Sequence, residues 1–171
     1  MRKFVCRVLV SIVTFLLGIA CGPSAPSAGA IPELKRGARA ISEIRLQRQG
    51  CTDPSEECRK YDVTFYRDGT ARYVGYEHSP DFIGSYHAEP GQFNFDRFAQ
   101  LIEQQGFFDM QAEYGGSWVV EKQTLTVVTN ESIKSVTTHN WIDTPTGLWT
   151  INGMLDYEVF EIGWDKDIGT K

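Results

Sequence analysis

The sequence is poor in the residues and motifs on which most enzyme chemistry depends. It contains only three histidines, without H-x-x-x-H spacing, and it has no G-x-S-x-G motif, P-loop or dinucleotide-binding fingerprint. Basic residues are also outnumbered, because 17 Lys and Arg face 22 Asp and Glu, giving a formal net charge of −5. This acidic balance argues against a nucleic-acid partner, whose phosphates would require a basic surface. We expect no cofactor.

Unusual composition is absent as well. The chain has 171 residues, of which 42% are hydrophobic and 23% charged, and these are ordinary values for a globular protein. Collagen-like, coiled-coil and wholly disordered chains are therefore excluded. We find no internal repeat, and the length suits one domain.

A hydrophobic run long enough to span a bilayer is missing, because the uncharged segment 8–20 is shorter than the roughly 20 residues that a membrane helix needs. Arg2, Lys3 and Arg7 precede this segment, and small residues follow it. A basic start, a short apolar run and small residues before a cleavage site are typical of a secretory signal peptide. We therefore assign residues 1–20 to a removable leader.

The end of this leader, Leu17-Gly18-Ile19-Ala20-Cys21, resembles the lipobox of bacterial lipoproteins. The resemblance implies lipid attachment to the Cys21 sulfur, cleavage before Cys21 and acylation, for example by palmitate, of the new amino group. The alternative is an ordinary signal peptide that happens to contain Cys21. Because Gly22 rather than Asp follows the cysteine, we expect an exported protein that is anchored in the outer membrane and faces the periplasm if the host is Gram-negative.

Residues 21–39 form a tether rich in Pro, Ser, Ala and Gly, between the lipidated cysteine and a single globular domain at residues 40–171. The mature net charge becomes −8, because the leader carries three cations and no anion. A domain this negative is not expected to lie flat on anionic lipid. The sequence thus predicts a globular domain held away from the bilayer.

Two cysteines, Cys51 and Cys58, remain after Cys6 leaves with the leader and Cys21 receives lipid. An even pair in an exported chain favours a disulfide bond. A zinc site would need two further ligands, and a catalytic thiol would need a reduced cysteine with a positioned histidine. Both alternatives are less favoured.

The periodicity of the domain predicts an α+β fold in which an antiparallel sheet of about six strands carries two helices on one face. Asp68-Gly69 between two alternating runs indicates a hairpin, and Asn94 and Gly106 fit the two ends of a helix. In that helix Phe93 and Phe98 would form a hydrophobic staple, and the second helix would follow Pro145. The expected strands are 41–48, 61–66, 71–76, 82–87, 118–120, 124–129 and 133–138.

One stretch also carries a family pattern. Gly50-Cys51, a second nearby cysteine, Tyr61-x-Val63-x-Phe65, Asp68-Gly69 and Tyr73-x-Gly75 follow one another, with a Thr-rich strand pair further on. This pattern resembles the bacterial domain-of-unknown-function family 6438, over about Ile41 to Trp164. The resemblance implies a domain common in exported lipoproteins, and it supplies no known activity and no catalytic residue.

Aromatic residues reach 12% and suggest a binding surface, because Tyr and Trp are favoured at interfaces. We take Tyr76, Trp118 and Trp141 as its candidate residues, and the loop 140–145, with one bulky ring among turn residues, as the first segment to inspect. Core packing is the alternative for such rings. The wider set of candidate aromatic residues also includes Tyr73, Tyr86, Tyr114 and Trp149.

We therefore expect a non-enzymatic, membrane-anchored binding domain with an envelope protein, peptide or glycan as partner. The alternative is a small envelope hydrolase that uses carboxylates or a histidine. A metal site at His78 and His87 is conceivable but lacks dense ligand spacing. Carboxylates available to a hydrolase are Asp68, Glu77, Asp81, Glu103, Asp109, Glu113, Asp143 and Asp156.

Overall fold

The computed structural model describes residues 40–51, 59–76, 82–116, 121–139 and 143–167, all within one compact unit, Arg36–Lys171. The leader 1–20, Cys21, the tether 21–39, Cys58, Trp118 and Trp141 lie outside the described residues, as does the side chain of Cys51. Of the helices described, none has the length and apolar character that a membrane span requires.

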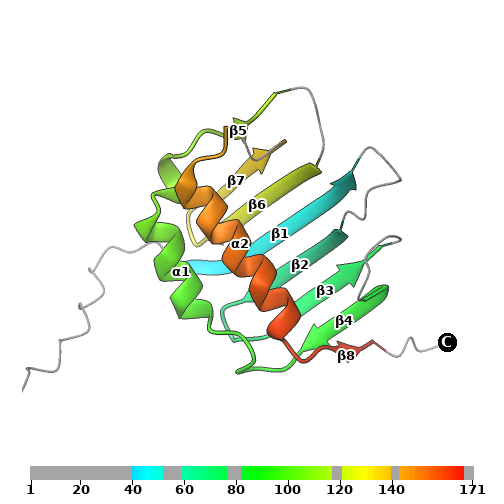
Figure 1. Cartoon of the computed structure of the whole chain (residues 1–171). Coiled ribbons are helices and arrows are strands. Elements are labelled where there is room, and N and C mark those ends of the chain that lie inside the picture. Colours follow the sequence, from blue (N-terminus) through cyan, green and yellow to red (C-terminus); the bar gives the residue numbers. More distant parts are fainter. Residues whose placement is uncertain (1–39, 52–58, 77–81, 117–120, 140–142, 168–171) are drawn as a thin grey trace, which may run out of the picture. The chain divides into compact units, whose positions relative to one another are not determined.

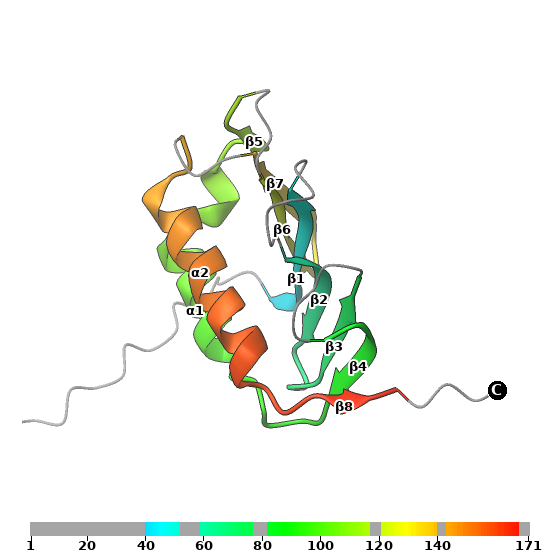
Figure 2. The same ribbon diagram turned by 45° about the vertical axis from the view of Figure 1, so that its right-hand side comes forward.

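Eight strands form one sheet in the order β5-β7-β6-β1-β2-β3-β4-β8, with helices α1 and α2 on one of its faces (Figures 1 and 2). The predicted α+β class is confirmed. The elements are β1 Ile41–Cys51, β2 Lys60–Tyr66, β3 Ala71–Gly75, β4 Gly84–Ala88, α1 Phe95–Gln104, the 3₁₀ helix η1 Phe107–Asp109, β5 Glu113–Tyr114, β6 Glu121–Thr129, β7 Ile133–Thr138, α2 Thr146–Glu161 and β8 Asp165–Lys166.

The sheet is antiparallel except where β5 pairs in parallel with β7. It has more strands than the expected six, because β5 and β8 are two-residue strands at its two edges. Segments this short have no periodicity of their own and become strands only by pairing with an existing edge. The expected strand 118–120 lies outside the described residues.

The β2–β3 hairpin forms where Asp68-Gly69 predicted it. Gly69 has a φ of 85°, and the Tyr66 amide donates to the Thr70 carbonyl at 2.9 Å. The Asp68 carboxylate accepts from the Thr70 amide at 2.9 Å and from the Thr70 hydroxyl at 2.7 Å. This turn sets the register in which Val63 pairs with Tyr73.

Both predicted ends of α1 are confirmed. The Asn94 side chain accepts from the Arg97 amide at 3.1 Å, and Gly106 adopts a left-handed φ of 67° directly after the C-cap. The Phe93 and Phe98 rings stack with centroids 4.8 Å apart, as the staple requires. Caps and staple together fix the angle at which α1 lies on the sheet.

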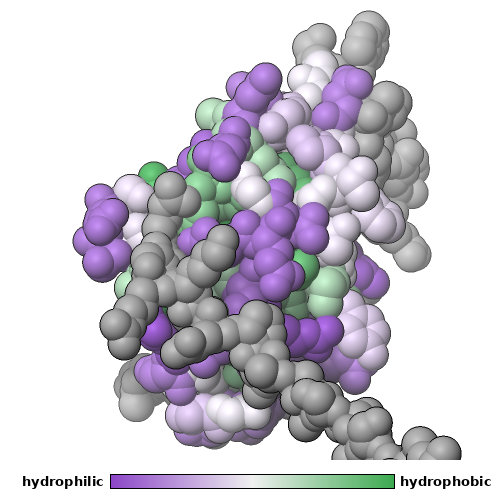
Figure 3. All heavy atoms as spheres, turned by 90° about the vertical axis from the view of Figure 1, so that its left-hand side faces the viewer, coloured by the Kyte–Doolittle hydropathy of each residue, from purple (hydrophilic) through white to green (hydrophobic). Residues whose placement is uncertain are grey.

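The core lies between the sheet and the helices. Alternate residues of the central strands, such as Ile44, Leu46 and Leu125, are fully buried against Leu148 and Leu155 of α2. Each such side chain contributes about 1.5–3 kcal/mol by leaving water. Viewed from the side of α1 and β7, hydrophobic residues are visible in the middle of a mostly hydrophilic surface (Figure 3).

The other face of the sheet carries no described helix or strand (Figure 2). Its side chains are largely polar and interact across the strands: the hydroxyls of Thr124 and Thr137 lie 3.1 Å apart, and those of Thr126 and Ser135 lie 2.8 Å apart. Such pairs stabilise an antiparallel sheet on a solvent-facing side.

The two ends of the sheet differ. β1 begins at the end that carries the β2–β3 turn and the β6–β7 turn, since Ile41 pairs with Thr129 and Glu43 with Tyr66. At the opposite end, Arg48 pairs with Tyr61 and with Gln123. β1 therefore begins at one end of the sheet (Figure 1), and the buried polar side chains Arg48 and Gln123 lie toward the other.

Candidate functional site

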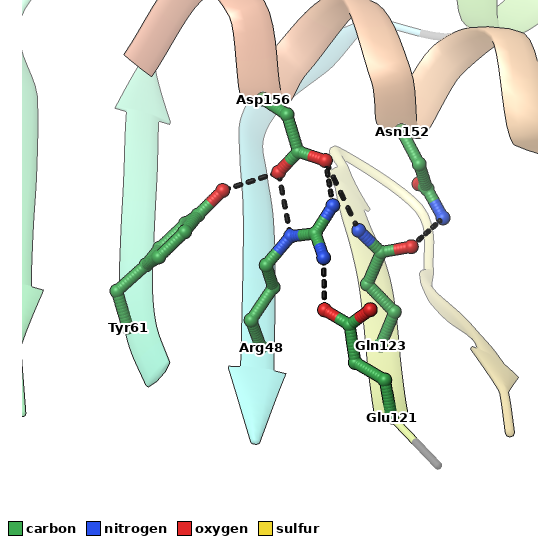
Figure 4. Close-up of polar contacts among 6 residues, drawn as sticks. All are labelled: Arg48, Tyr61, Glu121, Gln123, Asn152 and Asp156. Carbon is green, nitrogen blue, oxygen red and sulfur yellow. Dashed lines mark hydrogen bonds and ion pairs between the residues drawn. The ribbon is translucent and has the colours of Figure 1, made fainter. Parts of the chain in front are cut away.

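A buried network of polar side chains joins α2 to three strands near the far end of the sheet. Its centre is Arg48 on β1, which is only 7% exposed, and its main acceptor is Asp156 on α2, which is 8% exposed. Figure 4 shows Arg48 and Asp156 pointing toward each other between the sheet and the helix. The remaining members are Tyr61 on β2, Glu121 and Gln123 on β6, and Asn152 on α2.

Local structure explains why these side chains meet. Arg48 follows Ile44 and Leu46 in the alternation that points toward the helices, so its side chain enters the interior. Asn152 and Asp156 are one helical turn apart and face the sheet in the same way. The fold thus places a cation and a carboxylate on opposite sides of one interface.

The guanidinium of Arg48 binds two carboxylates. Its Nε donates to Asp156 Oδ1 at 2.7 Å, its Nη2 pairs with Asp156 Oδ2, and its Nη1 pairs with Glu121 Oε1. Two parallel bonds to one carboxylate form the bidentate geometry that makes such pairs strong and directional. Asp156 therefore fixes both the position and the plane of the guanidinium.

Tyr61 donates its hydroxyl proton to Asp156 Oδ1. Burial raises the pKa of Tyr61 to about 12, although the charge of Arg48 acts in the opposite direction. The phenol is therefore neutral at physiological pH and serves as a hydrogen-bond donor rather than as a base. Asp156 thus accepts from both Arg48 and Tyr61.

The carboxamide of Gln123 lies between the ion pair and Asn152. In the orientation of Figure 4 it donates to Asp156 at a long 3.4 Å and accepts from Asn152 at 3.0 Å. With its oxygen and nitrogen exchanged, the oxygen accepts from Arg48 Nε at 3.1 Å and from Nη2 at 2.8 Å. The exchanged orientation suits Arg48, because a guanidinium has only donors to offer, and it requires the Asn152 amide to be exchanged as well, so that its oxygen accepts from Gln123.

We call this network the clamp, because its hydrogen bonds join α2 to the sheet; its members are Arg48, Tyr61, Glu121, Gln123, Asn152 and Asp156. Each carboxylate is neutralised in part by Arg48, and the only phenol has a pKa far above neutral. Burying ions costs several kcal/mol each unless they are paired, and pairing across the interface makes the position of α2 specific. The network holds α2 against β1, β2 and β6.

The two described histidines lie in separate pairs. His87 Nδ1 lies 2.7 Å from Asp167 Oδ1 at the β4–β8 edge, whereas His139 Nε2 lies 2.5 Å from Glu113 Oε1 at the β5–β7 edge. His78, the other half of the conceivable metal site, is outside the described residues. Within the described ranges, no group of three or more metal-ligating side chains occurs.

A shallow depression of about 380 Å³ lies at the end of the domain where β1 begins. It lies between the β2–β3 turn and the start of α1. Two of its polar side chains, Asp68 and Asn94, already accept hydrogen bonds within the turn and the helix cap. These two groups therefore have a local structural role.

Of the three main candidate residues of the binding surface, Tyr76, Trp118 and Trp141, the structure describes Tyr76. It is 39% exposed and lies directly after β3, in line with the uncovered face of the sheet. Its hydroxyl donates to Asp62 Oδ2 at 2.8 Å, which raises its pKa, and the Lys60 ammonium lies 5.5 Å from its ring centroid. Tyr73, by contrast, is buried in the core among other rings, as the packing alternative predicted.

Sequence reasoning missed the network, although Asp156 was among the candidate carboxylates. The available signal was a charged residue in phase with apolar ones, as Arg48 is with Ile44 and Leu46. A second missed feature is the outer surface of α2, where Trp149 is 53% exposed and Tyr157 is 64% exposed. Trp149 was a candidate aromatic residue, and Tyr157 was not.

The protein is thus a two-layer α+β domain, with helices on one face of a sheet and the clamp between the two layers. The sequence profile described as "Domain of unknown function (DUF6438)" matches residues 42–158, and the chain belongs to this family. The match runs from the second residue of β1 to the last turns of α2, and it therefore includes every member of the clamp. No curated protein matches the chain.

Proposed function

We propose that the protein is a lipid-anchored envelope lipoprotein whose DUF6438 domain binds a protein, peptide or glycan and catalyses no reaction. The lipobox-like segment ending at Cys21 and the tether 21–39 support the anchor. The observation that carries the binding role is the internal pairing of the buried polar groups: Arg48, Asp156 and Tyr61 are committed to one another. A general acid or base needs a group free to exchange a proton with substrate.

The direction of the chain supports the same proposal. β1 begins at one end of the sheet, and Arg48 and Tyr76 lie toward the other. An anchor ahead of β1 would join the domain at the end of the sheet opposite to Arg48 and Tyr76. A binding domain benefits from this arrangement because the membrane would not block its partner.

A hydrolase is the less favoured alternative. Glu121 is the more accessible of the two acids in the network, with a side chain 17% exposed. Arg48 pairs with both Glu121 and Asp156. Both carboxylates bind the same guanidinium, whereas a glycosidase needs its two carboxylates free to face the glycosidic bond from either side. The pairing therefore favours structure over catalysis.

The anchor is tested by Cys21→Ala in cells that process lipoproteins. We expect the substitution to abolish palmitate labelling and to move the chain from the membrane to the aqueous fraction. Cys6→Ala is the matched control, because Cys6 lies within the leader and should leave labelling unchanged. Persistent labelling of Cys21→Ala would contradict the proposed lipidation.

The binding role is tested by cross-linking the lipidated chain in intact envelopes and identifying the products by mass spectrometry. We expect a reproducible partner that depends on the folded domain, and its loss in a variant unfolded by Leu155→Asp. Turnover of a model glycoside or peptide, lost in Glu121→Gln, would support the hydrolase instead.

A further inference from the structure

The outer face of α2 has the wrong composition for a helix that only faces water. Trp149, Gly153 and Tyr157 are spaced four residues apart and lie on one exposed stripe, and Phe160 lies one turn beyond them. A surface helix normally keeps charged and polar residues on the side away from the core. The outer face of α1 follows that rule with Asp96, Arg97, Gln100 and Gln104, and α2 does not.

The middle position of the exposed stripe carries no side chain, because it is Gly153. Gly153 is exposed, and a methyl group added there would meet no atom within 4 Å. Packing within the domain therefore does not require glycine at this position, although glycine weakens a helix interior. Its effect on the surface is a notch between two large rings.

The charges on α2 are all negative. The helix contains no Lys or Arg, and Glu158 and Glu161 lie in its last turns, with Glu161 accepting from the hydroxyl of Tyr157. Carboxylates are unfavourable at a helix C-terminus, where the backbone carbonyls already give a partial negative charge. This end of the helix therefore attracts cations that the helix itself does not supply.

The chain contains one example of the contact that such a surface favours. The guanidinium carbon of Arg59 lies 4.1 Å from the centroid of the Phe160 ring. Cationic side chains bind over the faces of aromatic rings, and neighbouring carboxylates strengthen the attraction. Tyr157 and Trp149, further along the stripe, present exposed rings of the same kind.

We propose that the outer face of α2, formed by Trp149, Gly153, Tyr157, Glu158 and Glu161, is a docking surface for a basic peptide segment of a partner protein. Lysine or arginine side chains of the segment stack on the two rings and pair with the two carboxylates, and an apolar side chain enters the notch at Gly153. This inference rests on the proposed binding function and names the chemistry of its partner.

The test uses the full chain, purified in detergent, and a fluorescein-labelled peptide of alternating arginine and leucine. Fluorescence anisotropy measures the affinity, and matched peptides carry glutamine or glutamate in place of arginine. We expect the arginine peptide to bind most tightly. Tyr157→Ala and Trp149→Ala should each weaken binding about three- to thirty-fold, the range expected for a cation over an aromatic ring.

Two controls separate docking from general attraction to an acidic protein. Ile133→Ala removes an exposed hydrophobic side chain on β7, and Glu89→Gln with Glu131→Gln removes two exposed charges outside α2. Both controls should bind the arginine peptide like the parent, whereas Glu158→Gln with Glu161→Gln should weaken binding at least several-fold. Circular dichroism checks that each variant is folded.

The proposal is overturned if the parent does not bind the arginine peptide, if the ring substitutions leave its affinity unchanged, or if the two pairs of charge substitutions have equal effects. Each of these outcomes is independent of lipidation at Cys21, because the titration is done in detergent. A failure of the docking surface is therefore distinguishable from a failure of the anchor, which membrane fractionation reports.

Discussion

Asp156 on α2 accepts two hydrogen bonds from the guanidinium of Arg48 on β1, although 108 residues separate them in the chain. This contact joins the first strand of the domain to its last helix. Because both side chains are buried, each depends on the other to offset the cost of leaving water. The stability of the domain should therefore respond strongly to either residue.

Arg48→Met should lower the free energy of unfolding by about 3–5 kcal/mol, because it leaves Asp156 buried without its cation. Urea denaturation measures the change. Arg48→Met combined with Asp156→Leu should cost less than the sum of the single substitutions. The matched control is Arg45→Met, whose side chain is 47% exposed and whose pair with Glu43 should contribute at most about 1 kcal/mol. Equal effects at positions 45 and 48 would contradict the role of the clamp.

Tyr61→Phe should cost about 1–3 kcal/mol near neutral pH, because Asp156 loses a buried donor. Its pH dependence has a definite sign. The pKa of Tyr61 is raised to about 12 in the folded state, so the unfolded chain ionises first, and the stability from this group is complete below about pH 10 and declines between pH 10 and 12.

The measurement for Tyr61 compares the stability of the parent and of Tyr61→Phe from pH 8 to 12. The difference between them should shrink as the pH rises through this window. A difference that stays constant up to pH 12 would show that Tyr61 does not titrate as described.

Gly153→Ala should stabilise the domain by about 0.5–1 kcal/mol, because alanine favours the helix and the added methyl group meets open space. Gly75→Ala should act in the opposite direction, since its methyl group would lie 1.7 Å from the Phe82 carbonyl oxygen. Thermal unfolding of both variants measures the contrast. Destabilisation by Gly153→Ala would mean that glycine at position 153 has a structural role.

The Cys51–Cys58 pair remains a prediction from the sequence. Intact-mass analysis of the mature chain without reductant should give a mass two hydrogen atoms below that of the dithiol. Cys58→Ser should then release one titratable thiol at Cys51. Two reactive thiols in the parent, purified from an oxidising compartment, would exclude the bridge.

Most of the fold could be predicted from the sequence because its signals are local. Alternation gave the central strands, Asp68-Gly69 gave the hairpin, and Asn94 and Gly106 gave the ends of α1. The edge strands β5 and β8 could not be predicted, because two residues carry no pattern and their conformation depends on a neighbour that is distant in sequence.

The polar site was harder to predict for a related reason. Neither Arg48 nor Asp156 stands out in the sequence by itself. The two form a buried ion pair only because α2 packs over β1. A charged residue in phase with buried neighbours is nevertheless a usable signal, since it requires a partner inside the protein. Tyr76 was chosen as a candidate from composition, which could not show that its hydroxyl is bound to Asp62.

The central position of β1 has a mechanical consequence. β1 has β2 on one side and β6 on the other, and its register with both extends over most of its length. If the anchor lies ahead of β1, tension along the tether pulls this strand lengthwise, while the hydrogen bonds that hold it run perpendicular to the pull. The hydrogen bonds of both ladders are then loaded together in shear, instead of breaking one after another. The domain should therefore withstand a force that would separate an edge strand such as β8 from the sheet.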